Sequence, residues 1–434
     1  MTRAVMRLPG ATAGQILIPT RGRLLRPPML PAQRSPAAAW KVAALLLALP
    51  MFAQCFQYMI DVPPLYALSK AWPLLMLPVG AWAVLALDLP YKPLYIATLV
   101  WLLGVTPVIG IVQLGNGAVD AMATTAKVWS YSFVFSAAGV LVLVNPAPAL
   151  LRRVIAWLGV ATFVVMLLLW VGVPVSSYGG GDVVTKLFMF DPERGYHIYM
   201  PMYFGVLLVL TLNRSFWARP AVWKFAAIAV AFAIMLMIYK ERVANVAAAA
   251  AMVFGAAMSV RRFRPAAFAV LGVAAVIFAL FLLNRLEDAS DLHDSLGGSL
   301  AVRRVSVATA WSYLTADPLR WLFGVGATTR FGDITLAGLF GNAMFFLTDI
   351  GWLGVIFEYG VIGALLMLLV HLAGWRQAIR WGRPDDPLSQ AFGDYIVYLL
   401  VGSAVYSVVF TPGELTTTMA LSYYFSRGAA AAET

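Results

Sequence analysis

The stretch TDIGWLGVIFEYGVIG, Thr348–Gly363, is apolar and aromatic almost throughout, yet it carries two carboxylates, Asp349 and Glu358. A carboxylate at the centre of a bilayer costs about 2.5–3.5 kcal/mol on insertion scales. In one continuous helix the two side chains point to opposite sides and lie about 13 Å apart along the axis. They therefore cannot form an acid–base pair. We expect Asp349 at the outer end of a membrane span, and Glu358 deeper and paired with a polar neighbour.

The whole chain has the composition of a membrane protein. Of its 434 residues, 62% are hydrophobic and 12% are charged, whereas soluble domains average about 25% charged. Apolar runs long enough to cross ~30 Å of hydrocarbon recur along the sequence. They predict an all-α polytopic fold of about 12 transmembrane helices, at residues 37–60, 66–87, 94–114, 127–144, 154–175, 197–213, 221–239, 243–260, 265–283, 350–373, 391–411 and 413–427.

The basic residues predict how these spans are oriented. The formal net charge is +11, and most arginines lie in alternate short loops, as the positive-inside rule expects of cytoplasmic loops. This placement does not resemble a stripe that binds nucleic acid. It predicts cytoplasmic termini and five regions: an N-terminal tail 1–36, a transmembrane bundle 37–283 of about nine helices with an outer loop 176–196, a large outer loop 284–342, transmembrane helices 343–427 and a C-terminal tail 428–434.

The outer face offers the room for a functional site. The loop 284–342 is too long for a simple turn, and its run SVATAWSYL predicts a surface helix. Cys55 is the single cysteine and the three histidines lie far apart, which argues against a disulfide and a metal cluster. No GxxxxGK[ST] loop occurs. We therefore expect no cofactor, and energy from an activated substrate or an ion gradient.

Several basic residues predicted on this face could bind an anion. KERVANV, Lys240–Val246, is either a hairpin tip whose charges extend to water or a place where Arg242 holds a phosphate through bidentate bonds. The large loop adds Arg303, Arg304 and Arg330, which are either solvated or retained for an anionic partner. In RGYHIYMP, the residues Arg194, Tyr196 and His197 either contact a substrate or anchor the chain at the interface.

These residues follow the pattern of a known family. RRVSVATAWSYLTADPLRWLFGVG, Arg303–Gly326, resembles the R…W…P…GxG run in the outer loop of the O-antigen ligase and Wzy-type polysaccharide polymerase superfamily. EYGVIG, Glu358–Gly363, resembles the E-x-G-x-x-G element that follows in that family. ERGYHIYMPMYFGVLL resembles its arginine–glycine entry into a mid-chain span, and KERV its outer-face arginine at a helix start. The resemblance covers about residues 190–375 and keeps the family's order.

The resemblance implies a GT-C-like membrane glycosyltransferase of the bacterial inner membrane. Its substrate would be a polyprenyl-diphosphate-linked oligosaccharide at the outer, periplasmic face, and its pathway would include a flippase and a chain-length regulator. For such a reaction, we expect Arg242 and Arg304, with Arg303 or Arg330, to hold the diphosphate. We expect Arg194, Tyr196 and His197 to bind substrate and Glu358 to be structural. Asp349 would be the general base.

Three functions stay open at this point. Ligases of the family carry histidine where this chain has Asp349, so a repeat-unit polymerase is favoured over transfer of glycan to lipid or protein. A transporter or flippase of lipid-linked sugars is the non-enzymatic alternative. Such transporters often consist of two similar halves, whereas the predicted loop lengths of the two halves differ sharply here.

Overall fold

The computed structural model describes residues 36–179, 187–191, 194–260, 298–327, 338, 340, 347–383, 385–407 and 411–433. Residues 41–434 form one compact unit, and residues 1–40 form a second, of which the beginning of the first helix is described. The predicted span 265–283 and the predicted tail up to residue 35 lie outside the described residues.

Helices form most of the described chain and follow the predicted apolar runs. The first half contains α1 (Pro36–Phe52), α2 (Pro63–Leu75), α3 (Leu77–Ala86), α4 (Lys92–Val100), α5 (Thr106–Leu114), α6 (Ala118–Thr124), α7 (Phe133–Val144) and α8 (Pro148–Gly172). The second half contains α9 (Tyr203–Ala218), α10 (Val222–Ile234), α11 (Arg242–Ser259), α13 (Gly298–Thr315), α14 (Pro318–Phe323), α16 (Gly351–Trp381), α17 (Pro387–Gly402) and α18 (Pro412–Glu433). Short π-helical or 3-10 turns extend some of them: η1 (Trp101–Val105), η2 (Thr125–Ser132), η4 (Met235–Tyr239) and η6 (Leu347–Asp349).

Within the described ranges, 7 helical stretches are long and apolar enough to cross a membrane. They are Pro63–Ala86, Lys92–Leu114, Ala118–Val144, Pro148–Gly172, Val222–Tyr239, Arg242–Ser259 and Gly351–Trp381. The fold is therefore that of an all-α polytopic membrane protein, and the number of 12 spans stays a prediction. The predicted surface helix in the large loop is confirmed, because α13 covers SVATAWSYL.

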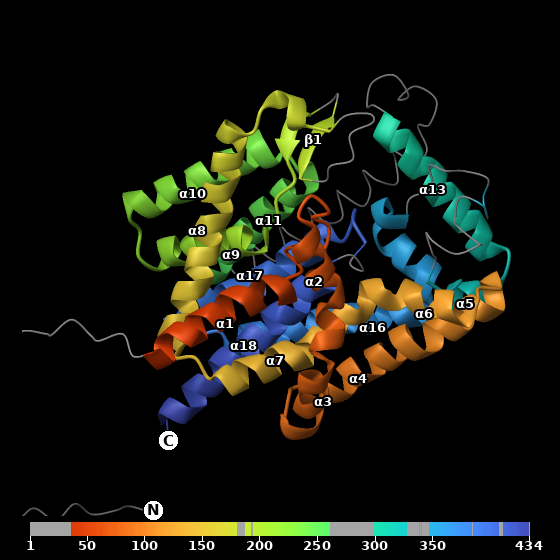
Figure 1. Ribbon diagram of the computed structural model, residues 1–434, viewed down its shortest axis with the longest axis horizontal. Helices are drawn as coiled ribbons and strands as arrows, with labels where there is room; N and C mark the ends of the chain where they lie inside the picture. The colour runs from red at the N-terminus through yellow and green to blue at the C-terminus, as the bar shows by residue number, and fades with distance from the viewer. Residues whose placement is uncertain are drawn as a thin grey trace, which may run out of the picture. The chain divides into compact units, whose positions relative to one another are not determined.

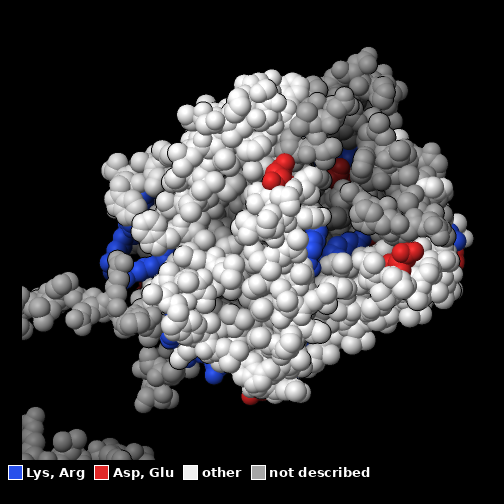
Figure 2. Space-filling view, viewed as in Figure 1, with Lys and Arg blue, Asp and Glu red and all other residues white. Residues whose placement is uncertain are grey.

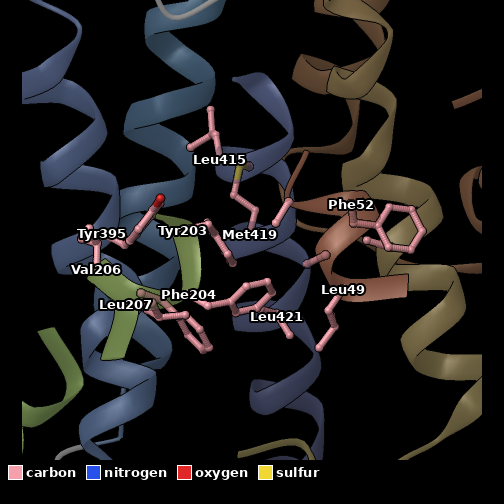
Figure 3. Packing of buried hydrophobic residues seen from close by; sticks show 14 of the residues in the cluster. Leu49, Phe52, Tyr203, Phe204, Val206, Leu207, Tyr395, Leu415, Met419 and Leu421 are labelled. Atoms are coloured by element: carbon pink, nitrogen blue, oxygen red, sulfur yellow. The ribbon is translucent and has the colours of Figure 1, made fainter. Parts of the chain in front are cut away.

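Helices from the C-terminal part occupy the middle of the bundle. In Figure 1, α16, α17 and α18 lie between α8–α11 on one side and α4–α6 on the other. The main hydrophobic core lies where α1, α9, α17 and α18 meet (Figure 3). There Tyr203 of α9 packs edge-on against Tyr395 of α17, with ring centroids 4.9 Å apart, and Leu415 and Met419 of α18 fill the space beside them. Such close packing matters in lipid, where burial from water contributes little to helix association.

A β-hairpin replaces the start of one predicted span. Strands β1 (Phe188–Asp191) and β2 (Gly195–Ile198) pair antiparallel, with Phe188 opposite Ile198. The prediction of a helix from residue 197 is therefore wrong, and α9 begins at Tyr203. Pro201 explains the shift, because the residue before a proline disfavours helical geometry. We call the end of the bundle that carries this hairpin the hairpin end.

A buried ion pair joins three helices at the opposite end. Arg214 of α9 donates two hydrogen bonds of 2.6 Å to the two carboxylate oxygens of Asp394 on α17. A side chain at Gly255 of α11 would lie 2.7 Å from the same carboxylate, so the absence of a side chain lets α11 approach. Both charges are almost fully buried, and bidentate geometry compensates part of their desolvation.

The helix α16 is not continuous. Gly360 has φ +68° and ψ 175°, a conformation that is essentially restricted to glycine, and it divides α16 into segments 351–359 and 361–381. The break leaves the last carbonyls of the first segment without helical partners. Three groups outside α16 supply them: Val325 N–H donates to the Phe357 carbonyl at 2.8 Å, Gly326 N–H to that of Glu358 at 3.1 Å, and Trp101 Nε1–H to that of Tyr359 at 3.0 Å.

The start of α16 at Gly351, which has φ +53°, corrects the prediction of one helix through Asp349 and Glu358. Asp349 ends the short turn η6, and Glu358 lies two residues before the break in α16. The calculated separation on one continuous helix therefore does not apply. The apolar pattern of the sequence could not show where the helix begins, because apolar residues lie on both sides of Gly351.

Replacing Gly360 by alanine is expected to destabilise the protein strongly. The new Cβ would overlap the Leu322 carbonyl oxygen, and the backbone would be held in a conformation that costs about 1–3 kcal/mol even without the overlap. Gly104→Ala is the matched control, because nothing lies within 4 Å of its Cβ position. Thermal unfolding in detergent should show a large fall in Tm for Gly360→Ala alone; equal Tm values would contradict the geometry of the break.

Removing one partner of the buried pair should also destabilise the protein. Arg214→Ala leaves the Asp394 carboxylate buried without a counter-charge, a change that costs about 3–5 kcal/mol in comparable pairs. Arg383→Ala breaks the exposed pair with Asp385, which contributes little because water screens it. We expect Arg214→Ala to lower the yield of monodisperse protein on gel filtration and Arg383→Ala to leave it unchanged. Similar yields for the two variants would show that the Arg214–Asp394 pair does not stabilise the fold.

Candidate functional site

An ion-pair network links the hairpin to α11 at the hairpin end. Arg194 Nη1 lies 2.6 Å from Glu241 Oε1, and Arg194 Nε lies 3.2 Å from Asp191 Oδ2. Lys240 Nζ donates to the Arg194 carbonyl at 2.9 Å. Burial lowers the pKa of Arg194, but the charges of Glu241 and Asp191 outweigh it and leave the pKa raised. The guanidinium therefore stays charged and fixed in place.

Tyr406, in the segment between α17 and α18, connects this network to two more predicted site residues. Its hydroxyl donates to Glu241 Oε2 at 3.4 Å, and the guanidinium of Arg303 lies 5.9 Å from the centre of its ring. Burial raises the pKa of Tyr406, the carboxylates of Glu241 and Asp349 raise it further, and Arg303 and Arg194 oppose them. These five residues, Arg194, Glu241, Arg303, Asp349 and Tyr406, are called the Tyr406 cluster.

Backbone contacts hold Asp349 beside Tyr406. The Ser407 N–H donates to the Thr348 carbonyl at 2.9 Å, which ties the segment after α17 to η6. Thr348 Oγ1 donates to Asp349 Oδ1 at 3.1 Å. The Asp349 carboxylate is half-buried, so it is oriented by a neighbour and still accessible.

The structure brings together only part of the predicted site. Arg194, Arg303 and Asp349 meet in the Tyr406 cluster. Arg242 follows Glu241 and is exposed in the first turn of α11, Arg304 follows Arg303 in α13, and Arg330 lies outside the described residues.

The two further residues predicted to bind substrate, Tyr196 and His197, lie on β2. His197 is 1% exposed and its Nδ1 lies 3.0 Å from the Gly195 carbonyl oxygen. Tyr196 packs against Tyr178 and Phe190. Their role in binding a substrate stays a prediction.

Sequence reasoning missed two members of the cluster. Glu241 carried a signal, because it lies between the cations Lys240 and Arg242, but no partner could be named for it. Tyr406 carried none, since a tyrosine near the end of an apolar run is typical of an interfacial anchor. Its contacts arise only because residues 403–407 fold back onto η6.

Glu358 is paired, as expected for a carboxylate in an apolar segment. Lys127 of η2 lies 2.5 Å from Glu358 Oε1 and 2.6 Å from Oε2, and the Glu358 side chain is 4% exposed. Figure 2 shows basic side chains set back in the surface beside α6, the helix that η2 extends. Lys127 thus neutralises the carboxylate next to the break in α16. The structural role of Glu358 stays a prediction.

Within the described ranges, no group of three or more His, Cys, Asp or Glu side chains could hold a metal ion.

Comparisons with known proteins found one weak structural similarity and no match in sequence. No family model matches the chain, and no curated protein matches it. Among solved structures, the chain is similar to one from a peptidoglycan synthase complex that coordinates polymerization and crosslinking, with a TM-score of 0.38 and 18% sequence identity, over 75% of this chain and 95% of that chain.

The pairing of Lys127 with Glu358 can be tested by a double-mutant cycle. Glu358→Gln or Lys127→Met alone leaves one buried charge uncompensated and should destabilise the protein by about 3–5 kcal/mol. The double variant Lys127→Met/Glu358→Gln removes both charges and should recover much of that loss. Thermal unfolding in detergent measures the cycle; additive losses would show that the two side chains do not stabilise each other.

Proposed function

We propose that this chain is a membrane-embedded glycosyltransferase that joins polyprenyl-diphosphate-linked oligosaccharide repeat units into a long polysaccharide at the outer face of the bacterial inner membrane. The observation that carries the proposal is a contact between two segments that resemble the same family. The GVG turn, residues 324–326, donates hydrogen bonds to carbonyls of the EYG segment, residues 358–360, and of Phe357 before it. Two patterns found separately in the sequence thus form one structural unit.

The Tyr406 cluster supports an anionic donor at this end of the bundle. Arg303 Nε is buried and has no hydrogen-bond partner among the described residues, and a buried donor without a partner costs about 1–3 kcal/mol. A phosphate oxygen would satisfy it, and guanidinium groups bind phosphates well because of their fork geometry. Arg242, Arg304 and Arg330 are the further residues proposed to hold the diphosphate.

The proposed reaction is a displacement at the anomeric carbon of the donor glycan. A hydroxyl oxygen of the acceptor sugar forms the new bond to that carbon, and the bond from the carbon to the phosphate oxygen breaks. The electron pair leaves with the polyprenyl diphosphate, whose charge the arginines stabilise. Asp349 receives the proton of the hydroxyl. The diphosphate is itself the activated leaving group, so the proposed step uses neither nucleotide nor metal.

The lipid-linked products in a strain that lacks the protein test the function. Loss of a polymerase leaves single repeat units on the carrier lipid and no long chains. A ligase would instead leave long chains that fail to reach their acceptor lipid or protein. A flippase would leave the single units on the cytoplasmic face, inaccessible to a periplasmic enzyme. Either of the last two results would overturn the proposal.

Single substitutions test the residue roles in the same strain. Asp349→Asn and Arg303→Ala are expected to reduce polymer formation by about 100-fold or more, as removal of a general base or of charge stabilisation does in other enzymes. Asp88→Asn, an exposed aspartate outside the cluster, should leave polymer length unchanged. Gel profiles of the polysaccharide, with protein amounts in the membrane as control, decide the outcome. Normal chains in Asp349→Asn would remove Asp349 from the mechanism.

A further inference from the structure

Glu414, a carboxylate outside the Tyr406 cluster, has an unused hydrogen-bond acceptor. Glu414 lies in the first turn of α18, and Tyr395 of α17 donates to its Oε2 at 2.6 Å. Among the described residues, no other side chain donates a hydrogen bond to this carboxylate, and the side chain is only half-buried. Its second oxygen, Oε1, can therefore accept a hydrogen bond from a ligand.

Further tyrosines lie near Tyr395. The ring of Tyr398 lies 5.2 Å from that of Tyr395. Tyr199, which precedes α9, stacks on Tyr239 with centroids 6.0 Å apart and is 39% exposed. Burial raises the pKa of Tyr199, and the carboxylates of Glu241 and Glu414 add to this effect. Its hydroxyl is therefore protonated and available as a donor. Tyr199, Tyr395, Tyr398 and Glu414 are called the Glu414 cluster.

The Glu414 cluster adjoins the Tyr406 cluster. Tyr199 stacks on Tyr239, which lies two residues before Glu241 of the Tyr406 cluster. Tyr395 of the Glu414 cluster packs against Tyr203, four residues after Tyr199, with ring centroids 4.9 Å apart. A ligand in the Glu414 cluster would thus lie next to the groups proposed to bind the donor diphosphate.

The chemistry of the cluster selects a neutral ligand that is rich in hydroxyl groups. A phosphate would find no Lys or Arg side chain in the Glu414 cluster, so nothing there would compensate its charge. A lipid tail cannot use the open acceptor or the tyrosine hydroxyl groups. A sugar can donate a hydroxyl to Glu414, exchange hydrogen bonds with tyrosine hydroxyls and place an apolar face against an aromatic ring. Aromatic walls with a few polar groups are usual in small-molecule sites.

We propose that the Glu414 cluster binds the acceptor sugar, whose hydroxyl group attacks the donor held at the Tyr406 cluster. This inference rests on the proposed function. Glu414 and the tyrosines are binding residues in it, whereas Asp349 remains the proton acceptor. The site would therefore consist of two adjacent halves, one cationic for the diphosphate and one aromatic and acidic for the acceptor.

Two probes can separate the two halves. The first is the repeat-unit oligosaccharide released from its diphosphate by mild acid, which keeps the acceptor hydroxyl groups but has no leaving group. The second is inorganic pyrophosphate. Binding of each to the full-length protein in lipid nanodiscs is measured by calorimetry, so an inactive variant still gives a result. Glu414→Gln should weaken oligosaccharide binding roughly tenfold, as expected for loss of one hydrogen bond, and leave pyrophosphate binding unchanged. Arg303→Ala should weaken pyrophosphate binding and leave oligosaccharide binding unchanged.

Tyr424→Phe is the matched control. Tyr424 lies on α18, as Glu414 does, and its hydroxyl donates to the Pro146 carbonyl, away from both clusters. Removing this hydroxyl should leave the binding of both probes unchanged. If Glu414→Gln does not fold, Tyr398→Phe takes its place, with the same expected selectivity. Equal weakening of both probes, or unchanged oligosaccharide binding, would overturn the inference. The proposed function fails separately, if single lipid-linked units do not accumulate in the strain that lacks the protein.

Discussion

Three hydrogen bonds to the carbonyls of Phe357, Glu358 and Tyr359 hold the centre of this fold together. A broken helix in a bilayer must find partners for its freed backbone groups, because lipid offers none. Here the partners come from the GVG turn and from Trp101, which are far from α16 in sequence. Because the GVG turn and Trp101 both donate to carbonyls beside the break, the break holds the span 92–114 and the turn after α14 against α16. An uninterrupted helix would need neither contact.

Three ion pairs among the described residues lie at different places in the bundle. Arg214–Asp394 joins α9 and α17 at one end, Lys127–Glu358 neutralises the carboxylate beside the break, and Arg194–Glu241 lies at the hairpin end. The first is almost fully buried and bidentate, which suits a structural role. The last is more exposed and shares Glu241 with Tyr406, so a charged ligand can compete for its partners. The buried Arg214–Asp394 pair is therefore suited to holding helices together, and the more exposed Arg194–Glu241 pair to contacting a ligand.

The sequence predicted the parts of this structure that depend on hydropathy. The apolar runs anticipated most of the observed helices, and the cost of a carboxylate in lipid anticipated a partner for Glu358. The identity of that partner, Lys127, depends on how distant helices pack and could not be derived from periodicity. Gly360 could not be recognised as a break, because a glycine in an apolar run is equally compatible with close helix packing. Arg194, Arg303 and Asp349 were found as separate candidates, whereas the tyrosine that brings them together gave no signal.

The charge balance of the Tyr406 cluster explains why a donor would need residues beyond it. Arg194 and Arg303 face the carboxylates of Glu241 and Asp349, so the cluster alone is close to neutral when all four are ionised. A diphosphate would bring further negative charge to this partly buried cluster, where unlike charges attract more strongly than in solution. Arg242 and Arg304, each next in sequence to a member of the cluster, can supply the missing positive charge. In the proposed function, donor binding would therefore depend on Arg242 and Arg304, and specificity for the acceptor on the tyrosines and Glu414 beside the Tyr406 cluster.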